Sequence, residues 1–237
     1  MAENRGTAFL AAFNDIEAYL RDVLNAKKSD GFSWMANLAA KKGLISREYA
    51  ADLKEFAELR NAISHGEYRD FKPIAEPLPE TVADIERIRD VLLRPALAIS
   101  VLGAQQVVTF APDDDIHSPL TTLRESKISQ FPIYDGTKYV GLLTTNAIAR
   151  WVAADLSADD KLDAITVAEA LHYSESQDQA VFLPRTATAL SALNALTTPL
   201  DDGTLPRAAI YTEAGHDTQK PLAVATASDI PSLLKAV

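Results

Sequence analysis

The sequence predicts an α+β protein of two domains, an N-terminal α-helical bundle over residues 1–98 and a pair of β-α-β units over residues 99–237. At 237 residues the chain is longer than one typical domain. Up to Pro95, apolar residues recur at spacings of three and four, which is the period of helices that face a core. After Pro95, short apolar runs alternate with helical stretches, and two strands followed by a helix occur twice.

Four amphipathic helices make up the predicted bundle. The first has its apolar stripe over residues 9–24, a short helix follows near 34–40, and a third begins near Ser46. Proline removes a helix hydrogen bond, so Pro95 is expected to kink or end the fourth helix, which begins at Glu80. The stripes of the first and fourth helices are Phe9, Phe13, Ile16, Leu20 and Leu24, and Val82, Ile85, Ile88 and Leu92.

The second half of the chain is an internal repeat. It begins with the apolar run Val107-Val108-Thr109-Phe110, which predicts a strand. A pair of strands joined by a tight turn then leads into a helix through Trp151, and a related pattern returns before the C-terminus. The paired strands are expected at 131–136 and 139–144, and again at 208–211 and 222–226 with a final helix from Asp229.

Composition limits the chemistry open to the chain. There is no cysteine, which excludes disulfides and thiolate metal sites. The four histidines show no zinc-ligand spacing, so no structural metal is expected. No apolar run approaches the roughly 20 residues of a membrane span, and the N-terminus lacks an apolar signal-peptide core, so no membrane partner and a cytoplasmic location are expected. The histidines are His65, His117, His172 and His216.

The formal net charge of −10 is unevenly distributed. Residues 1–100 carry 14 Lys and Arg against 16 Asp and Glu, whereas residues 101–237 carry nine against 17. Because the C-terminal half is acidic, it is a poor nonspecific binder of polyanions. Any contact with RNA is therefore expected in the N-terminal domain.

Residues 59–66, Leu-Arg-Asn-Ala-Ile-Ser-His-Gly, place an arginine, an amide and an imidazole at the end of one amphipathic helix. Gly66 is positioned to end that helix through a left-handed C-cap, which puts His65 on the last turn. There the negative end of the helix dipole favours the imidazolium, and Asn61, four residues earlier, can orient the ring. Arg60 adds a permanent cation. A general acid/base and a bidentate phosphate donor are what RNA cleavage by a 2'-hydroxyl requires, and no metal is needed.

The spacing of Arg60, Asn61 and His65 resembles that of the HEPN family, small helical bundles that include metal-independent endoribonucleases, over roughly the first hundred residues. The resemblance implies a homodimer in which two Arg60/His65 pairs face each other across a cleft. The histidine moves protons and the arginine stabilises charge on the phosphate. The alternative is structural: Arg60 pairs with Glu55, Glu58 or another helix carboxylate, and His65 caps the helix.

The two repeated units, near residues 107–155 and 164–237, resemble CBS motifs, which pair as a Bateman module. In that family a Thr or Ser, two further residues and then an Asp, at the start of the last helix, hold an adenosine ribose. Thr226 and Asp229 fit this pattern. The segments that carry the resemblance are Pro-Ile-Tyr-Asp at 132–135, Val-Gly-Leu-Leu-Thr at 140–144, Val-Phe-Leu-Pro at 181–184 and Ala-Val-Ala-Thr-Ala-Ser-Asp-Ile at 223–230.

A short carboxylate at position 229 can accept both ribose hydroxyl protons, and the helix N-terminus and the Thr226 hydroxyl favour a nearby phosphate. The resemblance therefore implies an adenine nucleotide as ligand. AMP, ADP, ATP, a cyclic dinucleotide and an adenosylated metabolite remain open. The structural alternative is that Asp229 only caps the first turn of the last helix.

One principal nucleotide site is expected rather than two. In the first repeat the same register keeps Thr144 but puts Ala147 where the acid belongs, and Asn146 points about 100° away on a helix. Arg207, just before the strand that starts at Ala208, is the expected phosphate contact, with Arg185 second; either can equally be a surface arginine. The expected nucleotide contacts are Thr226, Asp229, Arg207, Ala208 and Thr144.

The combined hypothesis is a homodimeric regulatory protein, in which a nucleotide-sensing CBS pair controls a HEPN-like domain with endoribonuclease activity. The competing hypothesis is a noncatalytic nucleotide sensor or dimerisation scaffold whose helical domain docks a partner protein. A third is a helical nucleic-acid binder that does not cleave.

Overall fold

The computed structural model describes residues 5–65, 75–159 and 162–237. Between Ala96 and Leu97 the chain divides into two compact units, which we call the helical unit and the repeat unit. The described residues form an α+β fold, as the sequence predicted, with the strands confined to the repeat unit.

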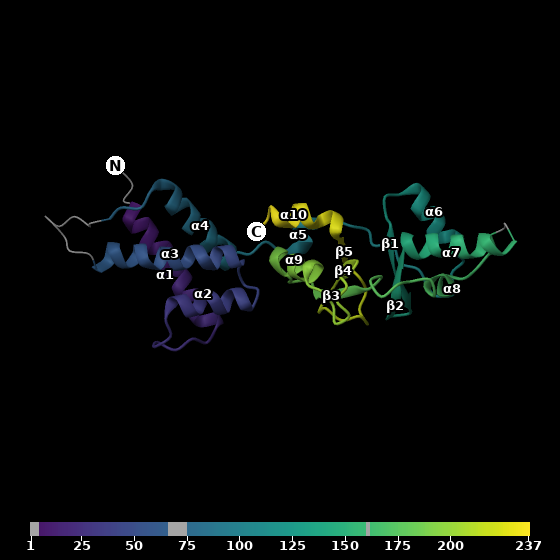
Figure 1. Ribbon diagram of the computed structural model, residues 1–237, viewed down its shortest axis with the longest axis horizontal. Coiled ribbons are helices and arrows are strands. Elements are labelled where there is room, and N and C mark those ends of the chain that lie inside the picture. Colours follow the sequence, from purple (N-terminus) through teal and green to yellow (C-terminus); the bar gives the residue numbers. More distant parts are fainter. Residues whose placement is uncertain (1–4, 66–74, 160–161) are drawn as a thin grey trace. The chain divides into compact units, whose positions relative to one another are not determined.

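The helical unit contains the four predicted helices (Figure 1). Their apolar stripes meet in one core. Helix α1 packs mainly against α4, and α2 mainly against α3. The rings of Phe13 and Phe32 lie 4.4 Å apart, and those of Phe9 and Phe56 lie 5.8 Å apart, so aromatic side chains join α1 to both α2 and α3. Helix α4 ends two residues before Pro95, as expected. The helices are α1 (Arg5–Val23), α2 (Phe32–Lys41), α3 (Arg47–His65) and α4 (Pro79–Leu93).

The repeat unit runs through the same order of elements twice. Each repeat has a short helix, a strand or bridge, a second helix, two antiparallel strands and a last helix. The first repeat comprises α5 (Ala98–Leu102), α6 (His117–Glu125), β1 (Gln130–Asp135), β2 (Lys138–Thr144) and α7 (Thr145–Asp159). The second comprises α8 (Val167–Leu171), β3 (Ala180–Pro184), α9 (Ala189–Thr197), β4 (Ala208–Thr212), β5 (Ala223–Thr226), the 3-10 turn Ala227–Asp229 and α10 (Ile230–Leu234).

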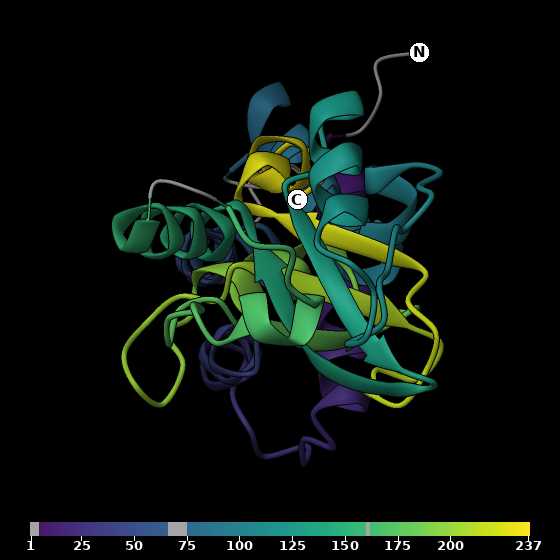
Figure 2. The same ribbon diagram turned by 90° about the vertical axis from the view of Figure 1, so that its right-hand side faces the viewer.

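Both predicted strand pairs are confirmed. Strands β1 and β2 form an antiparallel hairpin in which Gln130 faces Thr144, and Gly136 in its turn has a positive φ of 60° that favours glycine. Strand β4 lies between β3, to which it is parallel, and β5, to which it is antiparallel. In the β4–β5 pair Ala208 faces Thr226. The hairpin β1–β2 faces the viewer in Figure 2.

The strand predicted at 107–110 is reduced to one bridge, in which Phe110 lies parallel to Ile133. The Phe110 N–H donates to the Pro132 carbonyl at 3.4 Å, and its carbonyl accepts from Tyr134 N–H at 2.9 Å. Extending this ladder in either direction needs an N–H from Pro132 or from Pro112, which prolines lack. The pairing therefore stops on both sides of Phe110.

The two repeats exchange their short helices. At the start of α5, Ala98 N–H donates to the Ala187 carbonyl, just before α9, at 2.9 Å. At the start of α8, Val167 N–H donates to the Asp114 carbonyl, just before α6, at 2.9 Å. Helix α5 packs against α9 and α10, whereas Val167 and Ala170 of α8 are buried in the core of the first repeat. Each repeat therefore completes the other.

Replacing Leu20 with alanine is expected to lower the free energy of unfolding of the helical unit by about 2–5 kcal/mol, because the side chain is fully buried in its core. Urea unfolding of the full chain followed by circular dichroism measures this loss. The matched control is Leu93→Ala, at the end of α4, where the side chain is 40% exposed and the expected loss is below about 1 kcal/mol. Equal losses in the two variants would contradict the packing described.

Candidate functional site

Strand β5 leads directly into the first turn of the last helix at Thr226. Asp229 Oδ2 accepts hydrogen bonds from the Thr226 backbone N–H at 2.8 Å and from its hydroxyl at 3.2 Å. The Thr226 hydroxyl also lies 2.7 Å from the Ser228 hydroxyl. Asp229 therefore does cap this turn, as the structural alternative required. Among the described residues none donates a hydrogen bond to Asp229 Oδ1, so the carboxylate keeps an acceptor for a ligand.

A pocket with a volume of about 300 Å³ lies beside this turn. Three segments line it: residues 105–108 after α5, residues 127–130 leading into β1, and residues of β5 and the turn, including Thr226 and Asp229. The Gln105 side-chain oxygen accepts a hydrogen bond from Val224 N–H at 3.0 Å, which ties the first segment to β5. Because α5 belongs to the first repeat and β5 to the second, the pocket is built by both repeats.

The pocket's lining suits a small ligand with both apolar and polar faces. Its apolar side chains are those of Val107, Val108, Ile128 and Val224. Hydroxyl and amide groups provide neutral donors and acceptors, the Asp229 carboxylate provides one anionic acceptor, and Lys127 provides one cation. Aliphatic walls can hold a flat base, while a carboxylate and a cation can bind sugar hydroxyls and a phosphate.

Tyr211 on β4 is fully buried, and its hydroxyl has no hydrogen-bond partner among the described residues. Burial raises the pKa of its phenol far above the ordinary value, and the negative charge of Asp229 raises that pKa further. The Tyr211 phenol therefore stays neutral at physiological pH.

The expected phosphate contacts lie elsewhere. Arg207 is not among the lining residues of the pocket; its Nε lies 3.6 Å from Asp178 Oδ1. Arg185 forms an exposed ion pair of 3.5 Å with Glu213. Ala208 is fully buried in β4, opposite Thr226.

Lys127 and the 105–108 segment line the pocket, but the sequence did not predict them as site residues. The phosphate contact was predicted within the second repeat, beside Thr226 and Asp229. The exchange of α5 instead brings segments of the first repeat to this position. The only signal in the sequence was a polar run, Glu-Ser-Lys-Ile-Ser-Gln at 125–130, directly before a strand.

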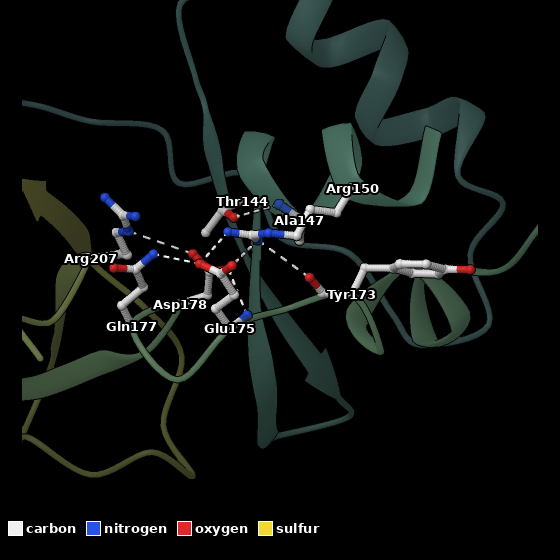
Figure 3. A network of polar contacts seen from close by, with 8 residues as sticks. All are labelled: Thr144, Ala147, Arg150, Tyr173, Glu175, Gln177, Asp178 and Arg207. Carbon is white, nitrogen blue, oxygen red and sulfur yellow. Dashed lines mark hydrogen bonds and ion pairs between the residues drawn. The ribbon is translucent and has the colours of Figure 1, made fainter. Parts of the chain in front are cut away.

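At the corresponding position of the first repeat, Thr144 is buried and its hydroxyl accepts a hydrogen bond from Ala147 N–H at 3.1 Å. Ala147 is fully buried and brings no carboxylate. Figure 3 shows that charged side chains gather here instead: Arg150 of α7 and Arg207 flank the buried Asp178. The two repeats thus differ in the chemistry of equivalent positions.

In the helical unit Arg60 is partly buried on α3, next to the exposed Asn61. Arg60 Nη1 donates a hydrogen bond to Asn61 Oδ1 at 3.3 Å, and the guanidinium carbon lies 5.7 Å from the centre of the Phe13 ring. Within the described residues Arg60 forms no ion pair with a carboxylate. His65 is the last residue of α3; its side chain, Gly66 and the loop to 74 lie outside the described residues.

No group of three or more His, Asp and Glu side chains able to hold a metal ion occurs in the described parts of the chain. Each described helix is too short or too polar to cross a lipid bilayer.

The sequence matches no protein-family model and no curated protein. Solved structures similar to the chain include CBSX2 in complex with AMP, at 14% identity over 60% of this chain and 92% of that one, with a TM-score of 0.37. A second is the CBS domain of a CBS domain containing membrane protein from Sphaerobacter thermophilus, at 20% identity over 66% and 98% of the two chains and a TM-score of 0.41. A third is the CBS domain of a bacterial CNNM/CorC family Mg²⁺ transporter with the inhibitor IGN95a, at 17% identity over 76% and 97% and a TM-score of 0.41. These structures are of the CBS kind that the repeats predicted, and their TM-scores lie below 0.5.

Proposed function

We propose that the repeat unit is a sensor of adenine nucleotides and that the ligand binds in the pocket of Thr226 and Asp229. The observation that carries this proposal is the Asp229 carboxylate, which lines a pocket of about 300 Å³. Its Oδ2 atom caps the first turn of the last helix, so its Oδ1 atom is available to a ligand. The resemblance of the two repeats to CBS motifs supports an adenine nucleotide as the ligand.

In this proposal each part of the ligand has its own contacts. The ribose hydroxyls donate to Asp229, and the Thr226 and Ser228 hydroxyls lie beside them. The base lies among the aliphatic side chains, and Lys127 attracts the phosphate. Since the lining segments come from both repeats, a bound nucleotide stabilises one arrangement of the repeats over others, which is the requirement for a sensor.

The output of such a sensor is proposed to be control of the helical unit, within a homodimer, by the arrangement that the nucleotide favours. A noncatalytic sensor that docks a partner protein through its helical unit is the alternative for the same binding site. The two differ in whether the purified protein has an activity that responds to the nucleotide.

Asp229→Ala is expected to abolish adenine-nucleotide binding, because it removes the acceptor of both ribose hydroxyls. Isothermal titration calorimetry should give one nucleotide per wild-type chain. In thermal unfolding, a nucleotide at 100 times its dissociation constant should stabilise the wild type by roughly 2.7 kcal/mol and the variant not at all.

The matched control is Asp201→Ala, which removes an exposed acid outside the pocket and should bind as the wild type does. If Asp229 only caps its turn, the variant loses about 1 kcal/mol of stability whether or not nucleotide is present, and its nucleotide-dependent shift is unchanged.

Lys127→Ala is expected to weaken binding of AMP by roughly two- to fivefold, because an ion pair between the exposed Lys127 and the phosphate contributes little energy. Binding of adenosine, which has no phosphate, should be unchanged. Calorimetry with the two ligands measures the difference. Lys138→Ala, which removes an exposed cation outside the pocket, should change neither affinity. Equal losses for AMP and adenosine would show that Lys127 does not contact the phosphate.

A second candidate function is metal-independent RNA cleavage by Arg60 and His65. The observation that favours it is the environment of Arg60: among the described residues its guanidinium contacts the Asn61 amide and the Phe13 ring and pairs with no carboxylate. Its positive charge is therefore not neutralised by those residues, and a phosphate can use it.

Cleavage of single-stranded RNA in the presence of EDTA tests this function. His65→Ala is expected to reduce the rate at least about 100-fold, the usual contribution of a general acid/base, with the melting temperature nearly unchanged. His216→Ala, an exposed histidine of the repeat unit, is the control and should cleave normally. RNA binding that survives His65→Ala without cleavage in either protein would favour a nucleic-acid binder, and neither binding nor cleavage would favour the partner-docking sensor.

A further inference from the structure

The register of the two strand pairs defines which residues of the repeats are equivalent. Gln130 faces Thr144 in the first repeat as Ala208 faces Thr226 in the second. Phe110 pairs in parallel with Ile133 as Leu183 pairs with Tyr211, which sets the register of the segments before them. Where the half with the open pocket has neutral polar side chains, the other half has charged ones. The equivalent pairs are Ser129 and Arg207, Ser232 and Arg150, and Gln105 and Asp178.

Asp178 lies at the centre of these charges, between two cations (Figure 3). Its side chain has no exposed surface. Oδ2 accepts hydrogen bonds from Arg150 Nη1 at 3.2 Å and from the Glu175 backbone N–H at 3.0 Å. Oδ1 lies 3.6 Å from Arg207 Nε. The three side chains come from α7, from the connection between α8 and β3, and from the residue before β4.

Asp178 and Arg207 form an ion pair without a hydrogen bond. The Oδ1 atom and the Arg207 Nε atom are both buried, and neither has a hydrogen-bond partner among the described residues. Arg150, in contrast, has further partners: it donates a hydrogen bond to the Tyr173 carbonyl at 3.4 Å and forms an ion pair with Glu175. A buried carboxylate is costly unless cations compensate it, and the two arginines provide this compensation for Asp178.

We propose that the Thr144 half of the repeat unit is a binding site for a small oxyanion, which the chain fills with its own Asp178 carboxylate. Two guanidinium groups that converge on one carboxylate present the donors that recognise phosphate or a free carboxylate. The covalent attachment of Asp178 keeps the site filled at all times. Removing that side chain vacates the space between Arg150 and Arg207, and a free oxyanion then binds in it.

The test compares the melting temperature of the full chain in sodium chloride and in inorganic phosphate at the same ionic strength. Asp178→Ala is expected to melt roughly 10 °C below the wild type in chloride, because Arg150 and Arg207 both lose their buried carboxylate partner. Phosphate should restore at least half of that loss. It should shift the wild type and the control Asp201→Ala, an exposed acid, by no more than about 2 °C.

The double variant Asp178→Ala with Arg207→Ala should lose the restoration by phosphate, since one of the two cations is gone. The proposal is overturned if phosphate shifts Asp178→Ala no more than the wild type, or if the double variant is restored equally well. Should Asp178→Ala not fold in chloride, refolding from urea decides: recovery in phosphate but not in chloride supports the proposal, and failure in both rejects it.

Discussion

The exchange of the two short helices is the constraint on which the rest of the repeat unit depends. Its backbone hydrogen bonds, from Ala98 to Ala187 and from Val167 to Asp114, fasten the start of each repeat to the other one. Since α8 also fills the core of the first repeat, neither repeat can bury its apolar surface alone. The segments that follow α5 and α8 are thereby held beside the strand pairs of the opposite repeat, where one lines the pocket and the other carries Asp178.

The same order of helices and strands occurs twice, but the side chains make one repeat site an open pocket and the other an ion-paired cluster. Beside Thr226 the lining is neutral except for Asp229 and Lys127, and the space stays open. Beside Thr144 the acid is absent and an ion-paired cluster centred on Asp178 occupies the corresponding segments. An ion pair with a buried member is stable only when its geometry is fixed from several directions. The cluster meets this requirement at Asp178 Oδ2, which is hydrogen-bonded to Arg150 and to the Glu175 N–H, and α8 packs against the helix α7 that carries Arg150.

Periodicity and turn chemistry were sufficient to predict the four helices of the helical unit, the helix through Trp151, the final helix and the two strand pairs, because these depend on residues close together in sequence. The strand at 107–110 could not be predicted correctly, since its limits are set by Pro112 and by Pro132, which meets it only in the folded sheet. Thr226 and Asp229 form a local pattern that the sequence displays. Lys127 and Asp178 act through residues that are distant in sequence, as the 28-residue separation of Asp178 from Arg150 illustrates.

A module with one open site and one that is permanently filled has a limited capacity to regulate. If the Thr226 pocket binds a nucleotide as proposed, the free energy available to shift the arrangement of the repeats is that of a single ligand. At 100 times the dissociation constant this is roughly 2.7 kcal/mol, which changes an equilibrium about 100-fold. The filled site adds nothing that depends on ligand concentration. The two arrangements must therefore lie within a few kcal/mol of each other without nucleotide, and the Asp178 cluster, present in all conditions, is one of the interactions that sets this balance.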